Sequence, residues 1–289
     1  MSVNLRKSRC FEIFLEYVLF LIFIGIFVGV SAGLLGIGGG FFMVPLQYFL
    51  LTSMGIDSNL ALRISIGTSL AVITPTALSG AYNHHQNLKN ILKPGILLGI
   101  FGIIGGILGA LTSSHLPSHI LTIILGVSLV IVAINMFIDK DSSLTNRFDN
   151  LKLSIYTASF FGTLVGFSSG LLGIGGGIIL IPILVFFLDF SMRESVGISL
   201  IFIALTAFGA AATYIITGWG INPIIYSLGY VNLVNFAVIA IFSIPTAYFS
   251  AKLVYKIPEK RLKQIFAIIT LYLGIKLLGL DPLSYILGF

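Results

Sequence analysis

The sequence predicts an all-α polytopic membrane protein made of two homologous halves of about five apolar segments each. Composition is the first observation, because 57% of the 289 residues are hydrophobic and 9% are charged. Charged side chains are costly inside a bilayer, so this composition is typical of chains that cross a membrane several times. The second observation is a doubled stretch, which reads G-L-L-G-I-G-G-G-F-F-M-V-P from Gly33 to Pro45 and G-L-L-G-I-G-G-G-I-I-L-I-P from Gly170 to Pro182.

The charge and the cysteine count exclude several other classes of protein. The formal net charge is +6, and no basic cluster is interleaved with aromatic residues as in nucleic-acid-binding surfaces. Cys10 is the only cysteine, which excludes an intramolecular disulfide and argues against a metal–thiolate cluster. We therefore expect no nucleic-acid partner, no metal and no cofactor.

Ten apolar runs follow one another along the chain. They fall near residues 12–32, 41–54, 60–82, 95–111, 119–138, 153–172, 178–188, 195–217, 224–251 and 264–280. A membrane-spanning helix needs about 20 apolar residues, so the short runs at 41–54 and 178–188 are predicted to be half-helices that return without crossing. The most polar stretch, 139–152, is a linker that divides the chain into a first membrane repeat at 1–138 and a second at 153–289.

Equivalent residues recur in the two halves. One set of matches is separated by 137 positions and pairs Gly25, Gly29 and Gly33 with Gly162, Gly166 and Gly170. A second set is separated by 130 positions and pairs Arg63, Ser65, Gly67, Ser69 and Leu70 with Arg193, Ser195, Gly197, Ser199 and Leu200. Duplicated halves are common in secondary transporters, whose sites lie between the halves near the middle of the membrane. Duplication also builds channels and proteins that transport nothing, so those alternatives stay open.

The distribution of Lys and Arg predicts the orientation. If the first two runs of each half enter and leave on the same side, and three single crossings follow, the halves are inverted repeats. The segments 83–94, 139–152, 189–194 and 252–263 then share one side and hold most of the basic residues, so the positive-inside rule places both termini outside. In the alternative orientation, the basic N-terminal tail lies in the cytoplasm. The first two runs then form one broken membrane crossing, and the two halves are not inverted repeats.

Each glycine-rich stretch is predicted to break a helix and to bind an anion. Consecutive glycines cost a helix about 1 kcal/mol each, so G-I-G-G-G is explained better by a break than by close packing. Inside a bilayer, a break is tolerated where it is buried in protein or lines a cavity. Its free N–H groups would lie at the N-terminus of the next helix, where an anion is favoured. The predicted substrate contacts are Gly36, Gly38, Gly39, Gly40, Gly173, Gly175, Gly176 and Gly177. The G-x-x-x-G glycines before each break are expected to serve helix packing instead.

Two arginines and several hydroxyl groups are further candidates. Arg63 and Arg193 hold equivalent places at the start of the third run of each half. Each is predicted either to attract or gate an anion or simply to extend to the membrane surface. The hydroxyl candidates for substrate binding are Ser69, Thr74, Thr76, Ser199 and Thr206. Buried hydroxyls often bond only to the carbonyl four residues earlier, which is the alternative for these five.

Other chemistry is sparse in the apolar runs. Acidic residues lie in loops and at run ends, so no carboxylate is available mid-span for a proton relay or an intramembrane acid–base enzyme. We therefore expect that the protein is not an enzyme. His84 ends the third run and is interpreted as a solvated interfacial residue, with a coupling proton as the alternative. Lys276, near the end of the last run, is expected to extend to the membrane surface.

The residues behind these predictions also carry a family resemblance. The two copies of G-L-L-G-I-G-G-G-x-x-x-x-P, with G-T-S-L at residues 67–70 and T-P-T-A at residues 74–77, resemble the TauE/SafE sulfite exporter family over essentially the whole chain. The resemblance implies a multi-pass transporter of the cell (plasma or inner) membrane for small anions such as sulfite or organosulfonates. The glycines and nearby hydroxyls would then contact the substrate. The second half lacks the Thr-Pro-Thr element, which argues against a symmetric binding role for it.

The predicted function is a secondary transporter, an exporter in keeping with the family, that moves small anions by alternating access between two repeats. One alternative is an anion channel, and another is a membrane-embedded assembly or enzyme component without transport. The expected partners are the small anionic substrate, the lipid bilayer and a second copy of the chain in a homodimer.

Overall fold

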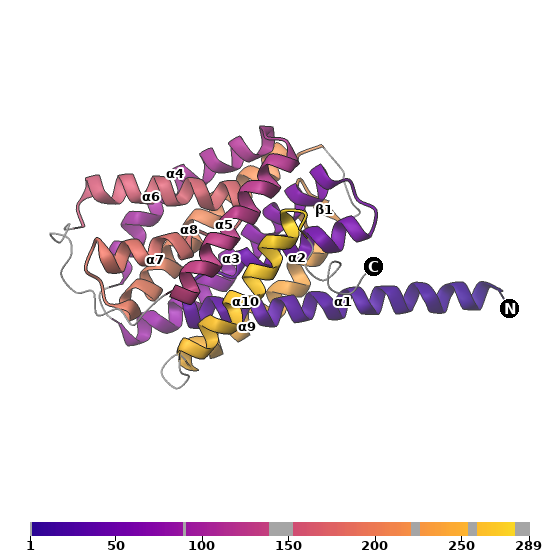
Figure 1. Cartoon of the computed structure of the whole chain (residues 1–289), viewed down its shortest axis with the longest axis horizontal. Helices are drawn as coiled ribbons and strands as arrows, with labels where there is room; N and C mark the ends of the chain where they lie inside the picture. Colours follow the sequence, from indigo (N-terminus) through magenta and orange to yellow (C-terminus); the bar gives the residue numbers. More distant parts are fainter. Residues whose placement is uncertain (1, 89–90, 139–152, 221–225, 254–258, 281–289) are drawn as a thin grey trace.

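The protein is a bundle of helices, some of which run along its longest axis while others are inclined to it (Figure 1). The structure is a computed structural model that describes residues 2–88, 91–138, 153–220, 226–253 and 259–280. The helices up to residue 138 are α1 (Ser2–Leu35), α2 (Gly40–Ser53), α3 (Ser58–Asn87), α4 (Leu92–His115) and α5 (Ser118–Ile138). Those after residue 152 are α6 (Ile155–Leu172), α7 (Gly177–Phe186), α8 (Met192–Thr217), α9 (Leu233–Leu253) and α10 (Glu259–Leu277). The all-α prediction is confirmed, with one helix for each apolar run, whereas the predicted linker at 139–152 lies outside the described residues.

A small β-hairpin joins α8 to α9. Its strands are β1 (Ser227–Leu228) and β2 (Val231–Asn232), which pair antiparallel with Ser227 opposite Asn232. The turn residue Tyr230 and both residues of β2 are buried against the helices. The strand β1 lies further out, with Leu228 exposed.

The predicted helix breaks lie at the two glycine-rich stretches. α1 ends at Leu35 and α2 begins at Gly40, while α6 ends at Leu172 and α7 begins at Gly177. In the first break Gly36, Gly38 and Gly39 have φ angles of 67°, 84° and 74°, and in the second Gly173, Gly175 and Gly176 have 71°, 91° and 80°. These left-handed conformations are strained for residues with a Cβ, which is why each break consists of glycines.

Both short helices double back along the helix before them. The Phe27 ring of α1 lies edge-on to the Phe42 ring of α2, with 4.6 Å between their centroids. Further along, Tyr17 of α1 and Gln47 of α2 both bond to Asn235 of α9. In the second half the ring of Phe161 lies 6.0 Å from that of Phe187, at the far end of α7. The first two runs of each half therefore do not continue in line as one broken helix, whereas the inverted arrangement of the halves in the membrane stays a prediction.

The G-x-x-x-G glycines let equivalent pairs of helices pack closely. α1 packs along α9, and α6 packs along α4. A Cβ on Gly29 of α1 would lie 2.5 Å from the Ser243 carbonyl oxygen, and one on Gly166 of α6 would lie 2.4 Å from the Gly102 carbonyl oxygen. The expected packing role of these glycines is confirmed, because only a hydrogen fits at such contacts.

α3 and α8 cross at the centre of the protein and run antiparallel. A Cβ on Gly67 near the start of α3 would lie 3.1 Å from the Cβ of Tyr214 near the end of α8. At the other end, a Cβ on Gly197 of α8 would lie 3.4 Å from the Cβ of His84 on α3. These two helices carry the equivalent arginines and serines of the sequence repeat. Their crossing brings equivalent residues of the two halves to opposite ends of the molecule.

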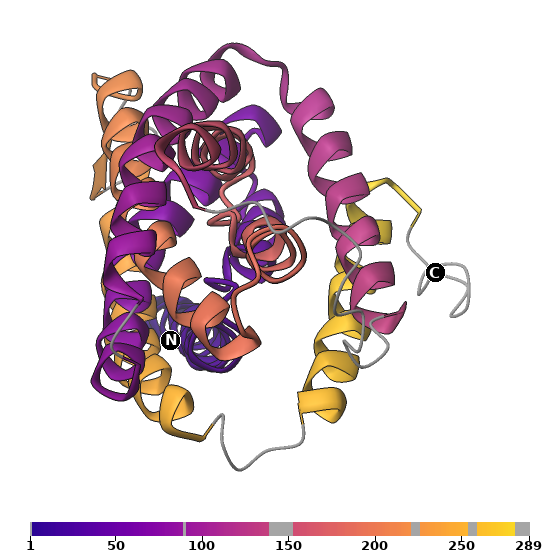
Figure 2. The ribbon, with the colours of Figure 1, turned by 90° about the vertical axis from the view of Figure 1, so that its left-hand side faces the viewer.

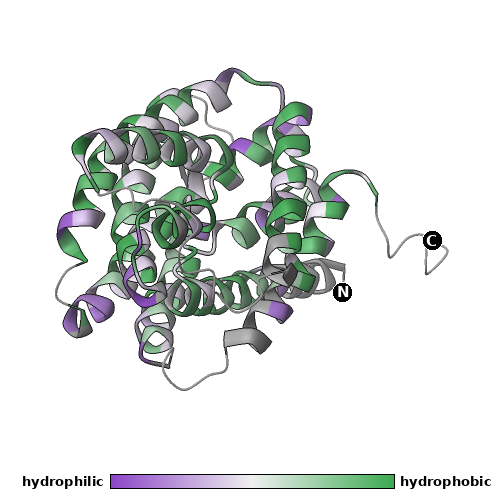
Figure 3. Ribbon diagram, turned by 60° about the vertical axis from the view of Figure 1, so that its left-hand side comes forward, coloured by the Kyte–Doolittle hydropathy of each residue, from purple (hydrophilic) through white to green (hydrophobic). Residues whose placement is uncertain are grey.

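The outer face of the helices is apolar. On α4, Ile96, Ile100 and Ile104 are exposed at intervals of four residues, whereas Gly95 and Gly99 face the protein. Hydrophobic residues dominate the helices in Figure 3, and α5 lies beside α10 on one side of the bundle in Figure 2. Within the described residues, the helices long and apolar enough to cross a membrane are Leu15–Leu35, Ser58–Gln86, Leu92–His115, Ile155–Leu172, Arg193–Thr217 and Leu233–Lys252. An exposed apolar surface of this extent is suited to lipid and not to water.

Candidate functional site

The two glycine loops, 36–39 and 173–176, meet at the centre of the protein. We call them the first and the second glycine loop. A Cβ on Gly40, which follows the first loop, would lie 2.4 Å from the Gly173 carbonyl oxygen. A Cβ on Gly177, which follows the second, would lie 2.5 Å from the Gly36 carbonyl oxygen. The backbones of the two halves thus touch, and the eight predicted glycines are brought together as one cluster.

Two equivalent serines tie each loop to the opposite half. Ser69 of α3 donates a hydrogen bond to the Gly173 carbonyl oxygen at 2.9 Å, and Ser199 of α8 donates one to the Gly36 carbonyl oxygen at 2.8 Å. Both serines are fully buried. The Ser69 hydroxyl hydrogen holds the second loop, and that of Ser199 is shared between the Gly36 carbonyl oxygen and the Val196 carbonyl oxygen, 2.9 Å away in its own helix. Both side chains therefore position the cluster.

The N–H groups of the glycine loops lack acceptors. α2 follows Gly39 and α7 follows Gly176, and neither helix has a side-chain cap. Among the described residues, no hydrogen bond is donated by the backbone N–H groups of Ile37, Gly38, Gly39, Gly40, Phe41, Ile174, Gly175, Gly176, Gly177 and Ile178. Two positive helix ends therefore share one buried space, which favours an anion on electrostatic grounds.

Aliphatic side chains enclose the loops. A Cβ on Gly38 and one on Gly175 would each lie 3.3 Å from Cγ2 of Ile203 on α8. Ile73 of α3 holds the equivalent place, with its Cδ1 2.6 Å from a Cβ on Gly40. All residues of both loops are buried. The cluster is thus closed off from both ends of the molecule in this conformation.

The threonine candidates are divided between packing and a free hydroxyl. Thr74 donates to the Leu70 carbonyl oxygen at 3.0 Å, and Thr76 bonds to the Val72 carbonyl oxygen at 2.8 Å and to the Ser243 hydroxyl at 2.7 Å. The fully buried Thr206 Oγ1 has no partner among the described residues and packs against α4. Thr74 and Thr76 thus bond to the carbonyl four residues earlier, which was the alternative to substrate binding. The buried hydroxyl of Thr206 makes no such bond and stays a candidate for substrate binding.

Neither arginine lies at the glycine loops. Arg63 is half-buried near the start of α3, where its Nη1 donates to the Tyr230 hydroxyl at 3.2 Å and its Cζ lies 5.8 Å from the centroid of that ring. Arg193 is exposed at the start of α8. Because α3 and α8 are antiparallel, the two guanidinium groups lie toward opposite ends of the crossing. Sequence reasoning missed the contact with Tyr230, since that residue lies outside the repeat.

A buried polar network at the Arg63 end of α3 was also missed. Gln47 accepts from Asn235 Nδ2 at 3.2 Å, and the Asn232 N–H donates to the Thr68 hydroxyl at 3.0 Å. Tyr17 donates to Asn235 Oδ1. The available signal was Gln47, an amide within the apolar run 41–54. The equivalent place of the second half holds Leu184. The network therefore belongs to one half only.

His84 is buried, so the solvated interfacial interpretation is wrong. Its side chain is 1% exposed, and its Nε2 lies 3.4 Å from the Gly33 carbonyl oxygen, three residues before the first glycine loop. The equivalent residue of α8, Tyr214, donates to the Gly170 carbonyl oxygen at 3.3 Å, three residues before the second loop. The 130-residue separation seen in the repeat pairs these two positions, and this was the signal that sequence reasoning did not use.

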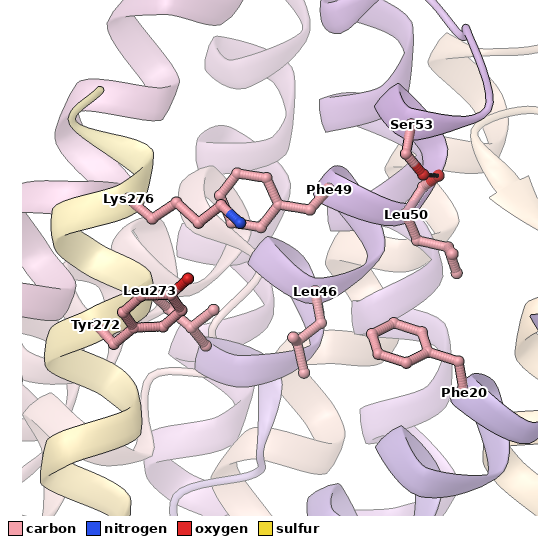
Figure 4. A pocket seen from close by; sticks show the side chains of 8 residues that line it. All are labelled: Phe20, Leu46, Phe49, Leu50, Ser53, Tyr272, Leu273 and Lys276. Carbon is pink, nitrogen blue, oxygen red and sulfur yellow. Dashed lines mark hydrogen bonds between the residues drawn. The ribbon is translucent and has the colours of Figure 1, made fainter. Parts of the chain in front are cut away.

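A groove of about 300 Å³ lies away from the glycine loops, between α1, α2 and α10. Figure 4 shows its lining, in which the Lys276 side chain reaches toward Phe49 across mostly apolar residues. The Lys276 Nζ lies 4.7 Å from the centroid of the Phe49 ring. Lys276 is thus half-buried against an aromatic face, and none of the predicted site residues lines this groove. The described residues contain no group of three or more His, Cys, Asp or Glu that could hold a metal ion.

Comparison with known proteins identifies the family. The family model for sulfite exporter TauE/SafE matches residues 21–277, which include both glycine loops. The chain belongs to the TauE/SafE family. A probable membrane transporter protein of Methanocaldococcus jannaschii is 32% identical over 246 residues, which cover 83% of this chain and 86% of the relative. A probable membrane transporter protein of Haemophilus influenzae is 30% identical over 269 residues, covering 90% and 98% of the two chains. No solved structure matches the sequence.

The TauE/SafE membership and the apolar helices agree on where the protein resides. It is a multi-pass membrane protein of a family whose relatives are named as probable membrane transporters. The family match extends from α1 to the end of α10, so it covers both halves and the central crossing.

Proposed function

We propose that the protein is a secondary transporter that exports small anions such as sulfite or organosulfonates by alternating access between two inverted repeats. One observation carries the proposal: two uncapped helix N-termini meet at the centre of a membrane protein with their N–H groups unpaired. An anion entering this space would receive hydrogen bonds from both halves and would offset the two positive helix ends. The name of the family, sulfite exporter, supports the substrate class and the direction.

A sulfite or sulfonate group fits the donors that the loops offer. Such a group has three oxygens in a compact pyramid, and each oxygen accepts more than one hydrogen bond. Backbone N–H groups of the two loops would replace the lost water, as anion sites at helix N-termini do. Thr206, whose buried hydroxyl has no partner among the described residues, is the side chain we expect to assist.

Inverted repeats would give the carrier two equivalent ways to open. The antiparallel crossing of α3 and α8 and the doubling back of α2 and α7 support this symmetry. Helix packing joins the two halves around the centre, and hydrogen bonds cross it, since one serine from each half bonds to the loop of the other. Rocking of one half against the other would break them on one side at a time.

The arginines would act away from the anion itself. Arg63 and Tyr230 would close one end, where the buried strand β2 contacts α3, and Arg193 would attract anions at the other end. A guanidinium is suited to both tasks because it stays charged and is bound by planar or aromatic partners.

Reconstitution in liposomes tests the transport class. Purified protein should take up labelled sulfite or sulfoacetate with saturation, and should show counterflow when the same anion is preloaded. A conductance without counterflow would indicate a channel instead. The absence of any flux would leave an enzyme or an assembly component as the better account.

The variants Gly38→Asn and Gly175→Asn test the glycine loops as the site. Asn tolerates a left-handed φ better than other L-residues, and its Cβ would meet the Cγ2 methyl of Ile203 at 3.3 Å, so the fold should persist. The side chain would then fill the space assigned to the anion, and we expect transport to fall by at least about tenfold, or about 1.4 kcal/mol in binding.

Gly55→Asn is the matched control for these loop variants. Gly55 has the same φ as Gly38, 84°, but lies exposed between α2 and α3 with nothing within 4 Å of a Cβ. We expect normal transport from it. Unchanged flux in both loop variants would show that the anion does not bind at the glycine loops.

A further inference from the structure

We propose that His84 binds the proton that couples transport, so that a proton and the anion cross together; this rests on the transport function proposed above. The residue is on α3 with its imidazole buried, and its Nε2 faces the Gly33 carbonyl oxygen at 3.4 Å. Gly33 is one helical turn from the first glycine loop. A charge on His84 would therefore lie close to a bound anion.

Comparison with the second half shows that an imidazole is not needed for the structural contact. Tyr214 holds the equivalent place on α8 and donates to the Gly170 carbonyl oxygen at 3.3 Å. A phenol does not change charge near neutral pH, whereas an imidazole does. Of two equivalent contacts, the one made by His84 can carry a proton, and this difference makes the halves chemically unequal.

One nitrogen of His84 is free to take the proton. The Gly33 carbonyl can only accept, so the neutral imidazole carries its hydrogen on Nε2 and leaves Nδ1 as the acceptor. Nδ1 is buried and has no partner among the described residues. Protonation at Nδ1 creates the imidazolium and keeps the bond to Gly33, so the loop stays in place in both states.

The charged groups around His84 offer it no counter-ion among the described residues. On α8, Arg193 is exposed, and the Glu194 carboxylate accepts from the Ser191 N–H and hydroxyl to cap the helix. Lys93 at the start of α4 and Lys252 at the end of α9 are exposed cations, and α1 has no titratable residue between positions 21 and 35. The adjacent His85 is half-buried, and Asp189, which precedes α8, is exposed.

A bound anion is then the charge that stabilises the imidazolium. A buried cation without a partner is costly, and so is a buried anion, but the two together lower each other's cost. By linkage, the anion raises the affinity of Nδ1 for the proton and the proton raises the affinity of the loops for the anion by the same factor. The proton is taken from water on one side with the anion and is released with it on the other, so export with this coupling is driven by an outward gradient of the anion.

His84→Tyr tests the proposal, because it gives the first half the residue of the second. Proteoliposomes are assayed with labelled sulfoacetate, which stays ionised near neutral pH and so is not redistributed by a pH gradient alone. Wild-type protein should show counterflow at equal pH. With the membrane potential clamped at zero, it should concentrate the anion on the alkaline side, up to about tenfold per pH unit for one proton. In His84→Tyr we expect counterflow to continue and the concentration ratio to fall to about one.

Two further variants keep the outcome decisive. His84→Gln also lacks a titrating group but keeps an N–H donor for Gly33, and it serves if the tyrosine does not fit. His85→Gln is the matched control and should retain concentration by the pH gradient. A His84 variant that still concentrates the anion overturns the proton site. Wild-type counterflow without concentration overturns the coupling alone, whereas wild-type protein without counterflow overturns the transport function and the coupling with it.

Discussion

Ser69 and Ser199 show how single side chains hold the centre together. Each is buried and donates to a carbonyl oxygen of the opposite glycine loop, at 2.9 Å and 2.8 Å. Those carbonyls belong to left-handed glycines outside any helix, so they have no intrahelical donor. The two hydrogen bonds therefore satisfy buried polar groups that the helix breaks create.

Ser69→Ala and Ser199→Ala should destabilise the protein by similar amounts. Each removes one donor and leaves one buried carbonyl unpaired, which costs about 1–3 kcal/mol. We expect each to lower the melting temperature measured in detergent. Ser114→Ala is the matched control, since Ser114 is a half-exposed residue whose hydroxyl bonds only within α4. Melting temperatures equal to that of the control would contradict the role of the crossed serines.

Close packing of α4 on α6, and of α1 on α9, sets the frame in which the loops meet. These contacts involve backbone against backbone, as at Gly166 and Gly102. Lipid competes with apolar side chains for such surfaces, so helix association in a membrane depends on close approach and not on hydrophobic burial. The same packing places the ends of α1 and α6 beside the ends of α2 and α7.

Gly166→Ile should prevent this packing. Its Cβ would lie 2.4 Å from the Gly102 carbonyl oxygen and 2.8 Å from the Gly102 Cα, and backbone cannot move aside as a side chain can. We expect a loss of more than about 3 kcal/mol, seen as aggregation or loss of the monodisperse peak in size-exclusion chromatography in detergent. Leu164→Ile, on the exposed face of the same helix, should elute normally. Normal elution of Gly166→Ile would show that α4 and α6 do not pack as described.

The arrangement of the two halves relates chemistry at one end of the molecule to chemistry at the other. Arg63 with Tyr230 lies toward one end of the crossing, and His84 with the start of α8 lies toward the other. The equivalent positions hold Arg193 and Tyr214. A carrier with this pattern would have the same helical arrangement in both halves but different polar side chains at its two ends.

Labelling of cysteines should place equivalent loops on opposite sides of the membrane. In a Cys10→Ser background, Gly55→Cys lies between α2 and α3, and Ser191→Cys lies between α7 and α8; both positions are exposed. If α3 and α8 cross the membrane antiparallel, a membrane-impermeant maleimide applied to intact cells should label one and not the other. After permeabilisation both should react. Labelling of both from the same side would rule out inverted repeats.

The sequence by itself determined the membrane class, the helices and the breaks. Low charge, apolar run lengths and the two G-I-G-G-G stretches are local properties, and each acts through lipid solvation or backbone conformation within a few residues. The doubled pattern also identified Ser69 and Ser199 as a related pair. It did not reveal that their hydroxyls bond to the loops, because that contact joins residues more than 100 positions apart.

Only the tertiary structure decided which of the candidates share a space. The antiparallel crossing brought the two glycine loops together and carried Arg63 and Arg193 away from them, and it buried His84 beside Gly33. It also paired Gln47 and Asn235, which no repeat relates. The physical reason is that proximity across helices depends on how their faces pack, and close packing is set by the joint shape of many side chains and bare glycine backbones, which no single stretch of sequence contains.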